Sequence, residues 1–179
     1  MDARPLPRFR YHPDPVATGA ITHSDDVCAC CGEATGFAYD GPLYADDEPD
    51  GAVCPWCIAD GRAAARWDME FTDPRPLAKA GVPGAVIEDV TRRTPGFTAW
   101  QQEEWLCHCG DACEFHGDAS TDDVRGASAM TRSAWCATYA LGEDQWALHA
   151  GAYVPGGDVG FYRFRCRHCG LTLLGWDCA

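Results

Sequence analysis

Two pairs of cysteines with the spacing Cys-x-x-Cys constrain this chain more than any other feature. Gly32 directly follows the first pair, and its freedom to adopt a positive φ suits a tight turn around a metal. Four thiolates suit one tetrahedral Zn²⁺, and residues 32–53 are long enough for a hairpin that brings the pairs together. We therefore predict a structural zinc site formed by Cys28, Cys31, Cys54 and Cys57. A disulfide scaffold and a redox-active pair are the alternatives.

A second Cys-x-x-Cys-Gly motif, at residues 166–170, requires two further ligands, and the dense cluster at residues 107–116 is their natural source. Residues 109 and 113 are four positions apart, so one helical turn or a compact loop places both on the same side. The predicted second site is Cys109, Cys113, Cys166 and Cys169. The main alternative pairs Cys113 with His116 as a substitute ligand. Two unrelated groups of buried thiols would explain the pattern without a metal.

Four of the twelve cysteines remain outside both predicted sites: Cys30, Cys107, Cys136 and Cys178. Cys30 lies inside the first motif and ranks second to Cys28 and Cys31 as a ligand. Cys136 has no partner motif and is predicted to be a buried structural thiol.

The first seven residues lack the apolar core of a signal peptide, and no apolar run approaches the roughly 20 residues of a membrane span. We therefore expect a cytoplasmic protein that does not insert into membranes. Because that compartment keeps thiols reduced, twelve cysteines favour metal ligation over disulfides.

The charge balance is acidic, with 27 Asp and Glu against 14 Lys and Arg and a formal net charge of −13. Non-specific binding to nucleic acid depends on a basic surface, which this composition does not supply. Five arginines are the only modest candidates for a basic stripe: Arg62, Arg66, Arg163, Arg165 and Arg167. The acidic charge fits solubility first and a basic protein partner second.

The pattern along the chain predicts a single α+β domain over residues 1–179, stabilised by two zinc ions. A zinc module at about 24–69 is expected to be treble-clef-like or zinc-ribbon-like, with a hairpin at 36–44 and a helix at 58–69. A helical connector follows at about 70–104, with a helix over 84–93. The second zinc module, at about 105–179, is expected to be rich in β structure, with a hairpin of residues 146–154 and 159–165 and a closing strand at 171–176.

No motif in the sequence specifies a reaction, so we expect a non-catalytic interaction or stress-tolerance protein rather than an enzyme. Four-thiolate zinc sites are closed, whereas a catalytic zinc keeps one open position. The first alternative is a thiol-redox or metal-handling enzyme that uses Cys54 and Cys57, because a Cys-Pro-x-Cys pair at the start of a helix can have a lowered thiol pKa. The second is a nucleic-acid-associated zinc-ribbon protein.

The chain also resembles the CbrC family over nearly its full length. The motifs that carry the resemblance lie at residues 9–15, 28–32, 53–61, 88–95, 100–105, 108–115 and 166–170. The resemblance implies a small bacterial protein of uncharacterised function, in a family named after a member linked to colicin tolerance. It implies no catalytic residue, and it favours Cys109 and Cys113 over Cys107 as ligands of the second site.

Overall fold

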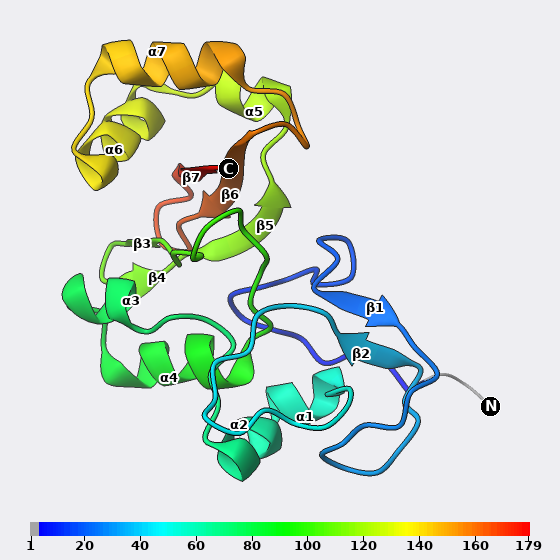
Figure 1. Cartoon of the computed structure of the whole chain (residues 1–179). Helices are drawn as coiled ribbons and strands as arrows, with labels where there is room; N and C mark the ends of the chain where they lie inside the picture. Colours follow the sequence, from blue (N-terminus) through cyan, green and yellow to red (C-terminus); the bar gives the residue numbers. More distant parts are fainter. Residues whose placement is uncertain (1–3) are drawn as a thin grey trace.

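The computed structural model describes residues 4–179, a mixture of short helices and small antiparallel sheets (Figure 1). Residues 1–3, part of the N-terminal stretch that was expected not to be a signal peptide, lie outside the described residues. The elements in chain order are β1 (Ile21–His23), β2 (Phe37–Tyr39), α1 (Pro55–Ala59), α2 (Arg62–Trp67), α3 (Arg75–Lys79), α4 (Gly84–Arg93), β3 (Cys107–His108), β4 (Asp111–Ala112), β5 (Glu114–Asp118), α5 (Thr121–Arg125), α6 (Ala129–Tyr139), α7 (Glu143–Ala152), β6 (Val159–Arg165) and β7 (Thr172–Cys178).

The N-terminal part is built around a small apolar core that includes the thiols of the first two cysteine pairs. Strands β1 and β2 pair antiparallel, and α1 and α2 lie below them in Figure 1. Ile21, Ile58 and Phe71 are almost fully buried in this core, together with Cys54 and Cys57. The first predicted metal site is therefore part of the packing of this region.

The C-terminal part is organised by a three-stranded antiparallel sheet in the order β5-β6-β7. Successive side chains of a strand point to opposite faces, and this alternation gives the sheet two separate cores. Phe164 pairs with Leu173 on the face toward the centre of the molecule, whereas Phe161 pairs with Trp176 on the opposite face. Helices α5, α6 and α7 cover that opposite face, at the top of Figure 1.

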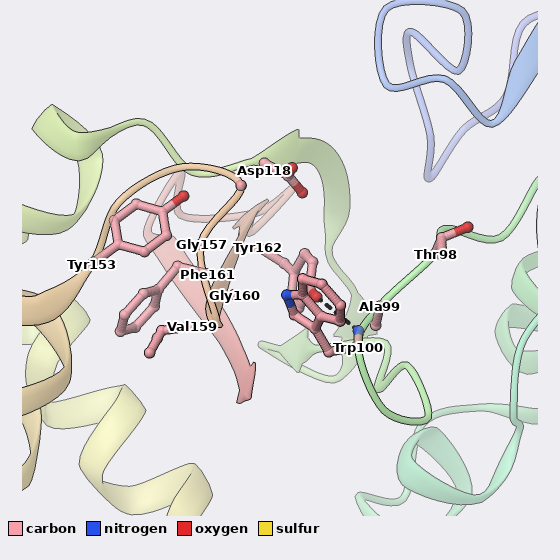
Figure 2. A pocket seen from close by; sticks show the side chains of 11 residues that line it. Thr98, Ala99, Trp100, Asp118, Tyr153, Gly157, Val159, Gly160, Phe161 and Tyr162 are labelled. Carbon is pink, nitrogen blue, oxygen red and sulfur yellow. Dashed lines mark hydrogen bonds between the residues drawn. The ribbon is translucent and has the colours of Figure 1, made fainter. Parts of the chain in front are cut away.

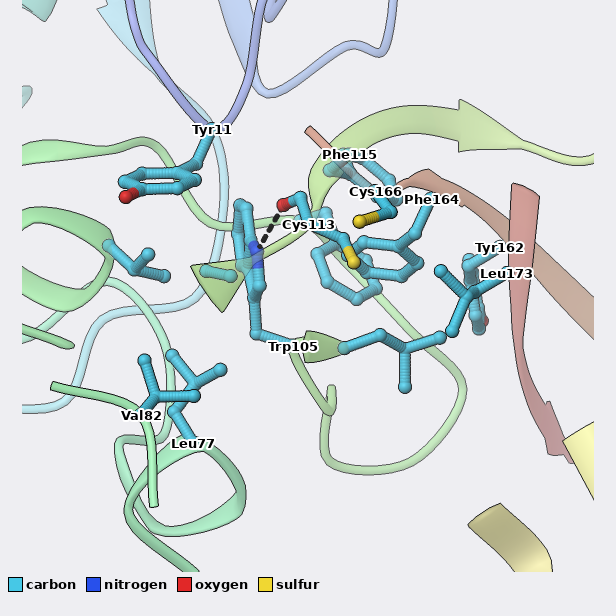
Figure 3. Close-up of a cluster of buried hydrophobic side chains, with 14 residues drawn as sticks. Tyr11, Leu77, Val82, Trp105, Cys113, Phe115, Tyr162, Phe164, Cys166 and Leu173 are labelled. Carbon is cyan, nitrogen blue, oxygen red and sulfur yellow. Dashed lines mark hydrogen bonds between the residues drawn. The ribbon is translucent and has the colours of Figure 1, made fainter. Parts of the chain in front are cut away.

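The central core joins this sheet to α3, α4 and the segment before β3 (Figure 3). Phe97 stacks on Phe115 with ring centroids 4.2 Å apart, and Trp105 packs edge-on against Phe164. The indole N–H of Trp105 donates to the backbone carbonyl of Cys113 at 2.9 Å. This hydrogen bond fixes the start of β5 from within the core. Because Glu114 of β5 pairs with Arg165, it also sets the direction of the chain next to the Cys-x-x-Cys-Gly motif at 166–170.

Three of the predicted elements agree closely with the structure. The helix expected over residues 84–93 is α4, the strand expected at 159–165 is β6, and the closing strand expected at 171–176 is β7. Mixed helices and small sheets are consistent with the predicted α+β class. Within residues 4–179, no helix is long and apolar enough to cross a membrane.

Three predicted elements differ from the structure. β2 pairs with the upstream β1, while Tyr44 forms a bridge with Glu70 instead of closing a hairpin at 36–44. The helix expected at 58–69 is divided because Gly61 takes the left-handed conformation (φ 78°) between α1 and α2.

The segment 146–154 is mostly the helix α7, in which Trp146 and Ala150 share the buried face at the i,i+4 spacing of a helix. The true C-terminal hairpin is therefore formed by β6 and β7.

Candidate metal centres

Cysteines 28, 31, 54 and 57, here called cluster 1, converge as the sequence predicts. Their four Sγ atoms all lie within 4.8 Å of one another. The Sγ–Sγ distance is 3.9 Å between Cys28 and Cys57 and 3.9 Å between Cys31 and Cys54. Zinc–sulfur bonds of about 2.3 Å at tetrahedral angles require sulfurs roughly 3.8 Å apart. The four thiols thus have the dimensions of a tetrahedral metal site.

The first half of cluster 1 is a tight backbone turn, here called a knuckle. The N–H of Cys28 donates to the carbonyl of Glu33 at 2.9 Å, and the N–H of Gly32 donates to the carbonyl of Cys28 at 2.8 Å. Gly32 has φ 75°, the conformation for which glycine is favoured. Burial opposes ionisation of the Cys28 thiol, but hydrogen bonds from backbone N–H groups, those of Cys31 and Cys54 first, outweigh burial and lower its pKa.

The second half of cluster 1 comes from the start of α1. Cys54 is extended and precedes Pro55, the first residue of the helix, so that Cys54 and Cys57 lie one turn apart on the same side. The N–H of Cys54 donates to the Sγ of Cys28 at 3.3 Å, which ties the two halves together. Burial raises the pKa of both helix thiols. Cys54 and Cys57 are 1% and 0% exposed, so the cluster is closed to solvent on this side.

A second group, here called cluster 2, consists of His108, Cys109, Cys166 and Cys169. Their ligand atoms also lie within 4.8 Å of one another. The Nδ1 atom of His108 is 3.2 Å from the Sγ of Cys109 and 3.5 Å from the Sγ of Cys169. Nitrogen and sulfur ligands of one tetrahedral zinc are roughly 3.6 Å apart, so this group also has the dimensions of a metal site.

The C-terminal half of cluster 2 repeats the backbone of the first knuckle. The N–H of Cys166 donates to the carbonyl of Leu171 at 2.8 Å, and the N–H of Gly170 donates to the carbonyl of Cys166 at 3.0 Å. Gly170 has φ 73°. Burial again opposes ionisation of the first thiol, and the backbone N–H of Cys169 leads the hydrogen bonds that lower the pKa of Cys166. The two Cys-x-x-Cys-Gly motifs therefore form the same local structure.

The other half of cluster 2 differs from the predicted set, because the structure contributes His108 in place of Cys113. Residues 107–112 form a tight hairpin of β3 and β4, with Cys109 (φ 54°) and Gly110 (φ 73°) at its two-residue turn. The turn presents Cys109 and the neighbouring His108 to the knuckle. Cys113 lies beyond the hairpin. Because the chain from residue 109 to 113 is not helical, the spacing of four residues does not place Cys109 and Cys113 on the same side.

The side chain of Cys113 is fully buried in the central core, where its sulfur lies near that of Cys166 (Figure 3). Burial raises the pKa of this thiol. The alternative ligand His116 is also absent from the group, since its Nε2 contacts the carboxylate of Glu114 at 3.3 Å. The signal that could have identified His108 is the hairpin turn at Cys109-Gly110, which places the preceding residue next to the turn.

The buried carboxylate of Asp111 anchors cluster 2 to the rest of the protein. It accepts hydrogen bonds from the hydroxyl of Tyr11 at 2.9 Å and from a guanidinium N–H of Arg167 at 3.2 Å. It also contacts the Nε2 atom of His168 at 3.0 Å. Arg167 and His168 are the two residues between the ligands of the second knuckle, so Asp111 holds that knuckle in place. Burial opposes ionisation of Asp111, but the hydrogen bonds of Tyr11 and then of His168 lower its pKa.

The remaining thiols stay outside both clusters. All twelve cysteines lie within residues 4–179, and none of them forms a disulfide. Cys30, Cys107, Cys136 and Cys178 are partly exposed and belong to neither group. The prediction of a buried structural thiol at Cys136 agrees with the structure only in part, because the side chain packs against the core beneath α6 and α7 but stays partly exposed.

Comparison with known proteins assigns the chain to a family. The model of the uncharacterised protein family UPF0167 matches residues 6–178. This chain belongs to the UPF0167 family. The identification with the CbrC family is therefore wrong, because the matching family and the curated relatives carry the name UPF0167.

A UPF0167 protein of Pseudomonas aeruginosa is 48% identical over 174 residues, which is 97% of each chain. UPF0167 proteins of Mycobacterium bovis and Mycobacterium tuberculosis are 52% identical over 119 residues, which is 66% of this chain and 64% of theirs. No solved structure matches the chain. None of these names states an activity, so membership of UPF0167 leaves the function to be inferred from the structure.

Proposed function

We propose that this UPF0167 protein binds two zinc ions as structural elements and acts as a non-catalytic interaction protein. The observation that carries the proposal is cluster 1, in which four thiols lie at tetrahedral spacing inside an apolar core. Four free thiols this close would otherwise crowd a buried site without forming a bond. A zinc ion satisfies all four and links the knuckle to α1, so that metal binding becomes part of the folding free energy.

The same reasoning supports zinc at cluster 2. Three thiolates and one imidazole are a common structural zinc set, and the His108 Nδ1 distances agree with it. The order of knuckle, second ligand pair and helix around cluster 1 further supports a treble-clef-like module at 24–69. We extend the proposal to a second zinc module at 105–179 and to a connector between the two modules. We also propose a reducing, cytoplasmic environment, in which the thiols stay available to bind metal.

The interaction role is supported by the charge of the protein. A formal net charge of −13 favours a basic partner and speeds encounter with it. The redox alternative, which uses Cys54 and Cys57, requires a thiol that a substrate can reach. Their exposed fractions of 1% and 0% argue against such a reaction. The partner proposed is therefore a protein surface rich in Lys or Arg.

Metal analysis of the purified full-length chain tests the zinc proposal. We expect about two zinc ions per chain and loss of the part of the thermal transition that comes from the N-terminal core when a strong chelator removes them. Restoring zinc should restore the transition, whereas magnesium, which prefers oxygen ligands, should not. Less than one zinc per chain together with a melting curve unaffected by chelation would contradict the proposal.

A further inference from the structure

A small surface pocket lies away from both clusters, between the loop that follows α4 and the segment that leads into β6. It encloses about 260 Å³ and is lined by Trp100, Asp118, Tyr153 and Tyr162, with Gly156, Gly157 and Gly160 supplying bare backbone. Figure 2 shows Trp100 beside Tyr162, with Asp118 and Tyr153 across the pocket. The pocket thus combines aromatic faces with one acidic side chain.

Trp100 is 56% exposed, yet its backbone is held in a defined position. Its N–H donates to the hydroxyl of Tyr162 at 3.3 Å, and that hydroxyl donates to the carboxylate of Asp177 at 2.9 Å. The next residue, Gln101, donates its N–H to the same carboxylate at 3.0 Å. A large indole displayed on a fixed loop is already ordered for contact with a ligand, which reduces the entropy lost on binding.

Gly160 keeps the floor of the pocket open. A Cβ atom at this position would lie 2.5 Å from Oδ1 of Asp177 and 2.7 Å from the hydroxyl oxygen of Tyr162. A side chain here would force Asp177 or Tyr162 to shift and would disturb the hydrogen bonds that position Trp100. The glycine therefore both permits the network and leaves its backbone bare toward the pocket.

Asp118 supplies the charge of the pocket. The register of β5 against β6 shifts between Phe115 and Asp118, and such irregularities re-aim side chains away from the regular pleat. Within residues 4–179, the Asp118 carboxylate forms no hydrogen bond or ion pair, and Arg163, which lines the adjoining cavity with it, pairs instead with Asp123 at 3.5 Å. Desolvation, and then the nearby charge of Asp177, raise the pKa of Asp118. Among the described residues, no cation pairs with its ionised form.

We propose that this pocket binds the cationic side chain of an arginine or lysine on a protein partner. The aromatic face of Trp100 attracts a guanidinium or ammonium group, and the free carboxylate of Asp118 provides the matching charge. The volume suits one long side chain, and the net charge of −13 disfavours an anionic ligand. This inference rests on the proposed interaction function and names the group that the basic partner would insert.

Short peptides with a single arginine test the pocket directly. The zinc-loaded full chain is titrated with acetyl-Gly-Arg-Gly-amide and with the matched peptide that carries citrulline, which has nearly the same shape but no charge. Binding is followed by calorimetry and by the NMR shift of the Trp100 indole N–H. We expect the arginine peptide to bind at least about tenfold more tightly than the citrulline peptide, and to shift that indole signal.

Two variants and one control assign the binding to this pocket. Trp100→Ala and Asp118→Asn should each weaken binding of the arginine peptide about tenfold, whereas Asp47→Asn, which removes the same charge from an exposed loop, should leave it unchanged. Equal binding of the two peptides, or equal effects of Asp118→Asn and Asp47→Asn, would overturn the inference. Because metal content and melting temperature are measured on the same samples, failure of the zinc proposal is distinguished from failure of the pocket.

Discussion

The two candidate metal clusters share one knuckle structure but differ in burial. Cys28, Cys54 and Cys57 of cluster 1 are at most 2% exposed, whereas Cys109 and Cys169 of cluster 2 lie at the surface. The difference arises from the second half of each cluster, which is a helix start inside a core in one case and a hairpin turn in the other. Identical local motifs therefore acquire different surroundings from the elements packed against them.

This difference predicts that the two metals contribute unequally to stability. At cluster 1 a bound metal would lie in the middle of the N-terminal core and hold it together where other cores have packed apolar side chains. At cluster 2 the central core beneath the knuckle is already filled by aromatic side chains and by Cys113. Removal of both metals should thus unfold the N-terminal core around cluster 1 and only loosen the surface around cluster 2.

The largest expected effect is that of breaking cluster 1. Cys57→Ser should remove one zinc ion and destabilise the protein by on the order of 5 kcal/mol, because metal binding and core formation are coupled there. The matched change Cys169→Ser, at an exposed ligand of cluster 2, should cost only about 1–2 kcal/mol, since water can approach and replace the lost ligand. Urea unfolding together with zinc analysis measures both. Equal losses of stability would remove the distinction between the clusters.

A smaller effect decides which residues form cluster 2. His108→Ala should weaken zinc binding at this cluster about 100-fold, because loss of a ligand costs at least as much as loss of a residue that orients one. Cys113→Ala should leave the affinity unchanged and cost about 1 kcal/mol of stability through lost packing.

Competition with a coloured zinc chelator gives the affinities of both variants. If Cys113→Ala weakens binding and His108→Ala does not, the sulfur set predicted from the sequence is the correct one.

A separate effect concerns acid sensitivity that does not come from either cluster. His12 is fully buried, with Nδ1 2.8 Å from the carbonyl of Pro95 and Nε2 2.7 Å from the hydroxyl of Thr18. Burial lowers its pKa from 6.5 to about 4, the Pro95 hydrogen bond opposes this, and the nearby charge of His116 adds to it. The unfolded chain therefore binds a proton between about pH 6.5 and pH 4 that the folded chain does not.

Stability is present in full above pH 6.5 and falls as the pH decreases through this window, by about 2 kcal/mol between pH 7.5 and pH 5. His12→Gln should flatten this part of the profile, although lost packing against Phe115 lowers stability at every pH. Urea unfolding at several pH values measures the difference between the two proteins. Metal release contributes equally to the stability of both proteins and cancels in the difference. An unchanged slope of stability against pH in the variant would therefore show that His12 is not the source of the acid sensitivity.

Much of cluster 1 could be predicted from the sequence because its information is local. Both copies of Cys-x-x-Cys-Gly in this chain form a knuckle, and Pro55 between the other two cysteines is typical of a first helical turn. Helix 84–93 was likewise predictable, since its apolar positions and the stop at residues 94–96 lie within a few residues of each other. In both cases neighbouring residues determine the conformation.

Long-range pairing decided what the sequence left open. The apolar segment 146–152 forms a helix because Trp146 and Ala150 pack on the sheet, and strand β2 pairs with a segment upstream of the first knuckle. The twelve cysteines alone determined that the chain would gather thiols in two groups. The tertiary structure decided that Cys113 belongs to a core and His108 to a cluster, because a hairpin turn, not a helical turn, presents the side chains to the second knuckle.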